Sequence, residues 1–259
     1  MRHLGILTLV ACAACLEAQT PVDKAWTILS TAAQDKSSEK RGKAIRALGM
    51  ISDNPRAQST AESALKDANE EVRVAACEAL GQMHAIGSAS LLKAAIKDHE
   101  AAVVFAAADA LFAIGDPAGY EVYYAVLTGE RKSGDSLIES QMKMLKDPKA
   151  LTQLGFDAGI GFVPFGGVAL TVIKTVETDN VSPVRAGAAV KLIGDPDPKS
   201  VDALSDATKD KHWLVRAAVI NALAKRHDSS VLPAITALLD DENDVVRFNA
   251  AAAVIHLTK

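Results

Sequence analysis

Residues 67–97 read DANEEVRVAACEALGQMHAIGSASLLKAAIK, and residues 210–240 read DKHWLVRAAVINALAKRHDSSVLPAITALLD. Both stretches have 31 residues, and in both the leading aspartate is followed six residues later by an arginine. Related copies occupy residues 35–66, 98–128 and 179–209, and a truncated copy occupies residues 241–259. Self-similarity at a period of this length indicates a chain built from repeated structural units.

Each copy is predicted to contain two helices. In residues 67–97, apolar residues recur at helical spacing in the first half and again around Leu91, Leu92, Ala95 and Ile96. We expect the leading aspartate to be the N-cap of the first helix, and a glycine to end that helix in several copies. One helical pair cannot bury its apolar face alone, so the pairs must stack into a solenoid. The first-helix core positions in two copies are Val72, Ala75, Ala76, Ala79, Leu80, Val215, Ala218, Val219, Ala222 and Leu223, and the glycines are Gly49, Gly81, Gly115 and Gly194.

The composition agrees with close-packed helices. Of the 259 residues, 49% are hydrophobic, which is enough for a core and excludes wholesale disorder. Only 4% are aromatic, and abundant alanine favours helices over a β-sandwich or barrel. The net charge of -4 gives no overall attraction to phosphate, so we expect no nucleic-acid partner. The predicted fold class is all-α, an α-solenoid of stacked helical pairs.

The shared positions D-x-x-x-x-V-R-x-x-A-x-x-A-L resemble the short HEAT-like repeats known from phycobilisome bilin lyases. The resemblance covers the copies described above and implies a HEAT-like solenoid. Families with this repeat include lyases, scaffolds and adaptors, so the resemblance implies no particular chemistry.

Residues 1–18 have the layout of a secretory signal peptide. A positive start at Arg2 precedes an uncharged apolar run over residues 4–16, and small residues follow. The run is too short for a stable membrane anchor. Cleavage after Ala18 would leave a mature chain that begins at Gln19, which predicts a periplasmic or secreted protein of the bacterial cell envelope.

The same N-terminal region allows two other interpretations. Residues 9–12, Leu-Val-Ala-Cys, resemble the lipobox of bacterial lipoproteins, which would make Cys12 the lipidated residue. Cys15 offers a weaker version of that motif. The third interpretation is a buried N-terminal helix. We therefore divide the chain into a signal peptide (1–18), N-terminal repeats (19–128), an insert (129–178) and C-terminal repeats (179–259).

The insert departs from the repeat pattern. Its central stretch, residues 158–173, carries no charge and is too short for a membrane span. We expect a buried helical hairpin that is bent around Pro164. The alternatives are a surface that meets a membrane or a partner, or a true span. The hairpin predicts Gly161 and Gly166 at or beside the bend, and Phe156, Phe162 and Phe165 buried.

An arginine occupies position seven in five of the copies: Arg41, Arg73, Arg185, Arg216 and Arg247. In the copy that begins at Asp98, Val104 takes this position. These arginines could form a basic ladder that binds an anionic ligand. We favour the second interpretation, in which each arginine pairs with an acidic residue of the adjoining turn and shields the seam between repeats.

The sequence carries no signature of an enzyme. The mature chain has no G-x-S-x-G, H-E-x-x-H or C-x-x-C motif. HEAT-like hydroxylases bind iron through several His-Glu pairs, whereas this chain has only His99-Glu100. His84 and His227 share one repeat position, where we expect solvated turn residues, and Cys77 is expected in the core. The prediction includes no catalytic residue, no cofactor and no metal site.

The tyrosines suggest where a partner would bind. Alignment of the copies places Tyr120 and Tyr123 at core positions and Tyr124 at an exposed position of the second helix. We expect the second helices to line the concave side, with Tyr124, Arg131 and Lys132 as candidate contacts. The predicted function is a non-enzymatic protein-binding scaffold or adaptor. The alternative is a lyase-like enzyme or small-ligand binder that uses the concave face.

Overall fold

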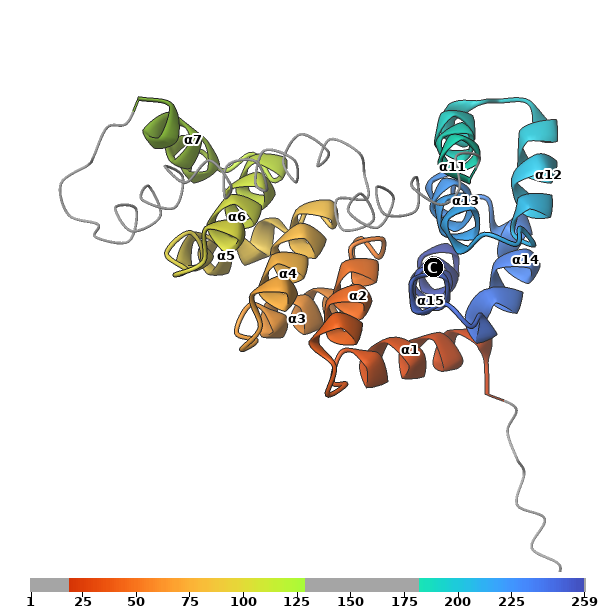
Figure 1. Ribbon diagram of the computed structural model, residues 1–259, viewed down its shortest axis with the longest axis horizontal. Helices are drawn as coiled ribbons and strands as arrows, with labels where there is room; N and C mark the ends of the chain where they lie inside the picture. Colours follow the sequence, from red (N-terminus) through yellow and green to blue (C-terminus); the bar gives the residue numbers. More distant parts are fainter. Residues whose placement is uncertain (1–18, 129–181, 259) are drawn as a thin grey trace, which may run out of the picture.

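The protein is an all-α solenoid whose helices stack into an open arc (Figure 1). The computed structural model describes residues 19–128 and 182–258. The predictions for the signal peptide and for the insert, including Arg131 and Lys132, lie outside these residues. Within the described residues every regular element is a helix.

Two sets of helices build the arc. The first helices of the repeats are α2 (Ser38–Leu48), α4 (Glu70–Gln82), α6 (Ala101–Ala113), α11 (Ser182–Lys191), α13 (Trp213–Lys225) and α15 (Asp244–Leu257). The other helices are α1 (Pro21–Ala32), α3 (Pro55–Ala64), α5 (Ala89–Ala95), α7 (Ala118–Thr128), α12 (Pro198–Ala207) and α14 (Leu232–Thr236). Short 3-10 turns are η1 (Ile86–Ser88), η2 (Leu192–Gly194), η3 (Ser229–Val231) and η4 (Ala237–Asp240).

Within the described residues the leading aspartates do not cap the first helices, so this expectation was wrong. The N-cap of α4 is Asn69, whose side chain accepts hydrogen bonds from the backbone N–H groups of Glu71 and Val72. Asp67 lies two residues earlier, and its carboxylate accepts the N–H of Asn69 at 2.9 Å. Such a bond closes an Asx turn. The aspartate therefore shapes the turn that leads into the helix.

The glycines have different roles. Gly49 is the C-cap of α2, and Gly115 follows α6 with a φ of 76°, a backbone conformation that favours glycine. Gly81 is the second-last residue of α4, which ends at Gln82, so this glycine also lies where the first helix was expected to stop. A Cβ atom at Gly81 would lie 2.9 Å from the Cα of Ala110. The absence of a side chain at Gly81 thus lets α4 and α6 approach closely.

The first helices, rather than the second helices, line the inner side of the arc (Figure 1). First helices of neighbouring repeats contact one another extensively, whereas second helices of neighbouring repeats do not. Small residues bring the first helices close together, as at Gly81 and Ala110, and a stack curves toward its more tightly packed side. The expectation that second helices line the concave side was therefore wrong.

The C-terminal repeats stack onto the N-terminal end of the N-terminal repeats. Along the arc the first helices follow the order α11, α13, α15, α2, α4 and α6 (Figure 1). In the last copy the structure describes one helix, α15, and α1 packs against it as a second helix packs against the first in other repeats. We call this junction of α1, α2 and α15 the terminal seam. Segments from opposite ends of the described chain thus complete one repeat.

Apolar packing holds the terminal seam. Ala25, Leu29 and Ala32 of α1 are buried and belong to the same apolar cluster as Val254 of α15. Polar contacts surround this core. Lys24 forms an ion pair with Asp240, and the guanidinium carbon of Arg56 lies 4.3 Å from the ring centre of Trp26. One core therefore runs through both sets of repeats.

The core agrees with the helical pattern of the sequence. Every first-helix position predicted from residues 67–97 and 210–240 is buried, and Cys77 is fully buried as well. Of the second-helix positions, Leu92 is fully buried, whereas Leu91 and Ile96 are half-buried. Within the part of the chain that the structure describes, no helix is both long and apolar enough to span a bilayer.

Candidate functional site

The arginine ladder consists of ion pairs between successive repeats. The Nε and Nη2 atoms of Arg216 each donate a hydrogen bond of 2.8 Å to the carboxylate of Asp241, which leads the next repeat. Nη1 donates to the backbone carbonyl groups of Asp210 and Lys211 in the repeat of Arg216 itself. Only 8% of Arg216 is exposed. Its guanidinium thus connects two turns and has little contact with solvent.

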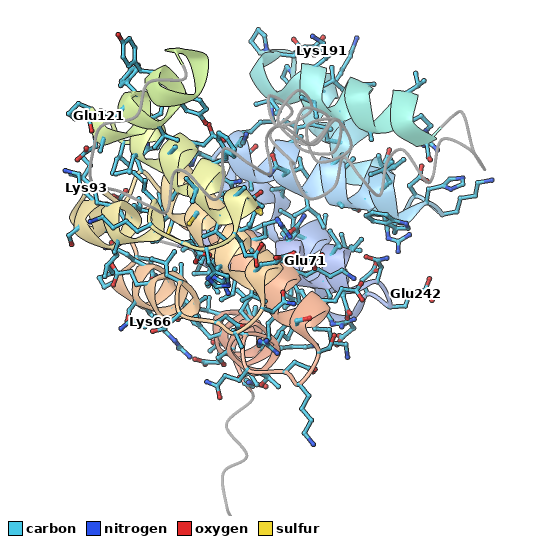
Figure 2. All side chains as sticks on the ribbon, turned by 60° about the vertical axis from the view of Figure 1, so that its left-hand side comes forward. Lys66, Glu71, Lys93, Glu121, Lys191 and Glu242 are labelled. Carbon is cyan, nitrogen blue, oxygen red and sulfur yellow. The ribbon has the colours of Figure 1, made fainter. Side chains whose placement is uncertain are left out.

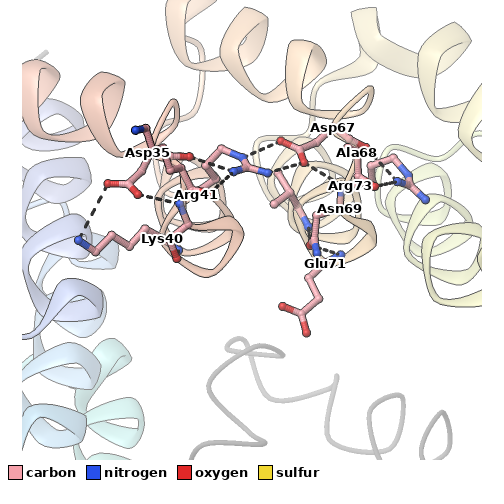
Figure 3. A network of polar contacts seen from close by, with 11 residues as sticks. Asp35, Lys40, Arg41, Asp67, Ala68, Asn69, Glu71 and Arg73 are labelled. Carbon is pink, nitrogen blue, oxygen red and sulfur yellow. Dashed lines mark hydrogen bonds and ion pairs between the residues drawn. The ribbon is translucent and has the colours of Figure 1, made fainter.

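Two arginines of the N-terminal repeats have the same geometry (Figure 3). Arg41 makes a two-pronged contact with Asp67, with both distances 2.8 Å. Arg73 binds Asp98 in the same way, at 2.8 and 3.0 Å. Arg185 also pairs with the leading aspartate of the next repeat, Asp210. Planar guanidinium groups match carboxylates in this two-pronged geometry.

The ladder is interrupted at two places. Arg247 lies beside the terminal seam and pairs with Asp244 of its own helix, while Asp35 at the start of the next repeat lies 4.0 Å from Lys40. Near the α6–α7 end, Val104 replaces the arginine and packs against Val122 of α7. The arginine–aspartate ion pairs between successive repeats therefore form within each of the two sets of repeats.

The pKa values of the ladder carboxylates follow from these contacts. The hydrogen bond from Arg41 lowers the pKa of Asp67, and this effect exceeds the opposing effect of burial. Burial raises the pKa of Asp98, but the hydrogen bonds from Arg73 and from the backbone of Glu100 outweigh it, so that pKa is lowered too. Both carboxylates are held in the ionised form. These contacts support the structural interpretation of the ladder.

A further seam contact has no clear sequence signal. Arg226, the C-cap of α13, donates through Nη1 to the backbone carbonyl groups of Leu192, Ile193 and Asp195. These carbonyl groups lie just after the first helix of the preceding repeat, α11, and before its second helix, α12. Because a helix end leaves carbonyl groups without intrahelical partners, a cation is well suited to this place. The other copies have no arginine at this position, so the repeat alignment gave no reason to select Arg226.

Exposed aromatic side chains gather at the α6–α7 end of the described arc. Phe112 of α6 is 52% exposed, and Tyr120 and Tyr124 of α7 are 57% and 59% exposed. Tyr123 is 37% exposed. The rings of Phe112 and Tyr120 are 4.9 Å apart. We call these four residues the aromatic end surface.

The structure corrects two of the tyrosine predictions. Tyr120 and Tyr123 were expected in the core, but both are exposed. Their counterparts in other copies pack against a following first helix, and within the described residues no such helix follows α7. Tyr124 is exposed, as its repeat position indicated. Its role as a partner contact stays a prediction.

Tyr123 has a defined polar partner. Its hydroxyl group donates a hydrogen bond to the carboxylate of Asp109 on α6, and its ring lies 6.2 Å from that of Phe105. Desolvation raises the pKa of Asp109, while the Tyr123 hydrogen bond lowers it by a smaller amount. Desolvation and the Asp109 hydrogen bond together raise the pKa of Tyr123. The phenol therefore stays protonated and orients the ring at the edge of the surface.

Charges of both signs flank the aromatic end surface. Figure 2 shows Glu121 on α7 and Lys93 on α5 at one edge of the molecule. The Nζ atom of Lys93 lies 2.8 Å from the carboxylate of Asp116, in the turn between α6 and α7. An apolar centre with a charged rim is typical of protein interfaces.

The turn histidines make specific contacts between repeats. His84 and His227 both have a φ of 53°, which is uncommon for residues other than glycine. Nδ1 of His84 lies 3.1 Å from the carbonyl oxygen of Ala113, and Nδ1 of His227 lies 3.1 Å from Nε2 of His256. The description of these histidines as merely solvated was therefore incomplete.

Other features of the described residues offer little chemistry. No group of three or more His, Cys, Asp or Glu side chains in the described ranges is arranged to hold a metal ion. Burial raises the pKa of the Cys77 thiol to about 12, so the reactive thiolate is disfavoured. Two surface hollows, of about 580 and 350 Å³, lie at turns between helices. The first is lined by Ser30, Thr31, Gln34, Asp35 and Lys36, and the second by Lys211, His212, Trp213, Arg216, Glu242 and Asn243.

The family model of HEAT repeats matches this chain over residues 25–111, 59–130 and 170–255. A comparison with curated proteins gives no significant match.

Three solved structures match this chain along most of its length. Human deoxyhypusine hydroxylase in complex with glycerol is 19% identical, with a TM-score of 0.35, and the match covers 92% of this chain and 97% of the hydroxylase. An engineered protein is 16% identical, with a TM-score of 0.32 and coverage of 90% and 96%. A designed armadillo repeat protein is 18% identical, with a TM-score of 0.27 and coverage of 92% and 100%.

Proposed function

Because the chain belongs to the HEAT-repeat family, we propose that it is a non-enzymatic scaffold that binds another protein through the aromatic end surface. HEAT-like solenoids expose extended surfaces on a rigid stack. In this chain, one end of the described stack exposes four large aromatic side chains. That cluster is the observation that carries the proposal.

The chemistry of the surface fits a protein partner. Tyr and Phe side chains provide large contact areas at a low cost in conformational entropy, and aromatic residues are enriched in interface cores. A contiguous exposed apolar patch on a folded protein often marks an interaction site. The ring pair of Phe112 and Tyr120 would form the centre of the contact, and Tyr124 would extend it.

Partner capture with matched variants tests the proposal. The mature chain serves as bait in an envelope extract beside the Phe112→Ala/Tyr124→Ala variant. Ile86→Ala is the control, because Ile86 is also exposed, at 70%, but lies in η1 between α4 and α5. Any captured protein is then purified, and its affinity for each bait is measured.

The proposal expects one partner that binds the wild-type chain and the Ile86→Ala chain equally. Loss of two aromatic contacts should weaken its binding by about 2 kcal/mol or more, which is roughly 30-fold. Equal affinity for all three baits would contradict the proposal. Circular dichroism spectra of the baits establish that the substitutions leave the fold intact.

We also propose that the chain is exported, which rests on the sequence of residues 1–18. Helix α1 begins at Pro21 with Thr20 as its N-cap, so cleavage after Ala18 would leave this helix complete. Mass spectrometry of the native protein should find an N-terminus at or near Gln19, or a lipid on Cys12 or Cys15. An intact Met1 on a protein of the cytoplasmic fraction would refute export.

A further inference from the structure

Two histidine rings from successive repeats lie together at the C-terminal ends of their helices. His227 follows the C-cap of α13, and His256 lies in the last turn of α15. Nδ1 of His227 and Nε2 of His256 are 3.1 Å apart, and the ring centres are 4.9 Å apart. The packing of α13 against α15 holds this pair across the seam between the two repeats.

The separation of the two nitrogens fits ligation of one metal ion. With metal–nitrogen bonds of about 2.0–2.1 Å and angles of about 90–110° at the metal, two ligand nitrogens lie about 2.9–3.4 Å apart. Neutral imidazole is a good ligand for Zn²⁺, Ni²⁺ and Cu²⁺. The observed 3.1 Å lies within this range. A small change in the direction of the two lone pairs would replace the direct hydrogen bond by a shared ion.

The electrostatic surroundings also favour a cation. The C-terminal end of a helix carries partial negative charge, and this pair lies at two such ends. Two cations precede His227: Lys225 is exposed in the last turn of α13, and Arg226 donates its hydrogen bonds to carbonyl groups of the preceding repeat. His227 contacts the following repeat instead. The guanidinium is thus engaged on the opposite side of the turn.

We propose that His227 and His256 form a binding site for a divalent transition-metal ion of the Zn²⁺ class, with water completing the coordination. The ion would connect the end of α13 to the end of α15. Such a site has two protein ligands, and its affinity is expected to be moderate. The site was not anticipated from the sequence. Alignment of the copies placed His227 at the same repeat position as His84 and gave no reason to relate it to His256.

The repeat itself provides a matched comparison. His84 has the same φ and the same repeat position as His227. The residue that corresponds to His256 in the repeat after His84 is Ala113, and His84 contacts its carbonyl oxygen. His84 therefore has an oxygen acceptor where His227 has a second imidazole. Removal of His84 should leave the metal site intact.

Isothermal titration of Zn²⁺ into the full-length protein without a histidine tag tests the site near neutral pH, and every chain compared carries Cys12→Ser and Cys15→Ser because this pair of thiols could itself bind Zn²⁺. Zn²⁺ is preferred to Cu²⁺ or Ni²⁺ as the probe because the N-terminal sequence Met1-Arg2-His3 could itself bind those two ions. The titration compares the wild-type chain with His227→Ala, His256→Ala and His84→Ala. His99→Ala is included because His99 lies 3.4 Å from Asp98 and 3.6 Å from Glu100. Thermal unfolding with and without Zn²⁺ provides a second readout.

We expect one Zn²⁺ equivalent whose affinity falls about tenfold or more in His227→Ala and in His256→Ala. The affinity should be unchanged in His84→Ala and His99→Ala. Zn²⁺ should raise the melting temperature of the wild-type chain more than that of His227→Ala. Equal affinity in the wild-type and His227→Ala chains, or loss of binding in His99→Ala alone, would overturn the proposal.

Discussion

The Nζ atom of Lys24 lies 2.6 Å from the carboxylate of Asp240, although the two residues are 216 positions apart in the sequence. This pair lies at the terminal seam, where α1 completes the repeat that α15 begins. Helices α1 and α15 therefore join the two sets of repeats in the middle of the described arc. The aromatic end surface lies at one end of that arc (Figure 1).

We expect the loss of a buried ladder ion pair to reduce stability more than the loss of an exposed ion pair. Arg216→Ala should lower the free energy of unfolding by about 3 kcal/mol, because it leaves the buried Asp241 carboxylate without its partner. Lys24→Ala should lower it by less than about 1 kcal/mol, because the Asp240 side chain is 77% exposed. Urea denaturation of both variants measures the difference. A loss in Arg216→Ala no larger than that in Lys24→Ala would contradict the larger contribution of the buried ladder pair.

Two glycine-to-alanine substitutions should change the stability of the fold in opposite directions. In Gly81→Ala, the new methyl group would lie 2.9 Å from the Cα of Ala110, so α4 and α6 must move apart at a cost of about 1–3 kcal/mol. In Gly187→Ala, the methyl group meets nothing within 4 Å, and the higher helix propensity of alanine should stabilise α11 by about 0.5–1 kcal/mol. Thermal unfolding distinguishes them. A stabilising effect at Gly81 would contradict the close approach of the first helices.

Acid should weaken the ladder. The pKa of Asp67 is lower in the folded protein than its unfolded value of about 3.9, so its ion pair stabilises the fold fully above that value. This stabilisation is lost as the pH falls through about 4 toward the folded pKa. In Asp67→Asn the group no longer titrates, so stability should fall less between pH 7 and pH 3. Identical pH profiles for the two proteins would exclude a contribution from this carboxylate.

The sequence predicted the repeats and their core because both depend on local periodicity. Val72 and Leu80 are buried where the helical spacing placed them. The terminal seam could not be predicted in this way, because α1 precedes the recognised copies and its partner α15 lies at the other end of the chain. The shorter last copy, residues 241–259, gave no indication of which helix packs against it.

The candidate site was predictable only in part for a similar reason. Alignment treats every copy as an interior repeat, so it placed Tyr120 and Tyr123 in the core. In the structure α7 is the last described helix at its end of the stack, and both side chains are exposed. The contact between His227 and His256 was also missed, because position eighteen of one copy meets position sixteen of the next only after the repeats stack.

Zero-length crosslinking between an amine and a carboxylate tests the terminal seam most directly. Carbodiimide treatment of the purified chain, followed by protease digestion and mass spectrometry, should yield a peptide pair joined through Lys24 and Asp240 in the monomer band of a denaturing gel. Lys24→Gln, which removes the amine, should abolish this product. If Lys24 and Asp240 are not joined, or are joined only between two chains in a dimer band, the two sets of repeats do not form the single arc described here.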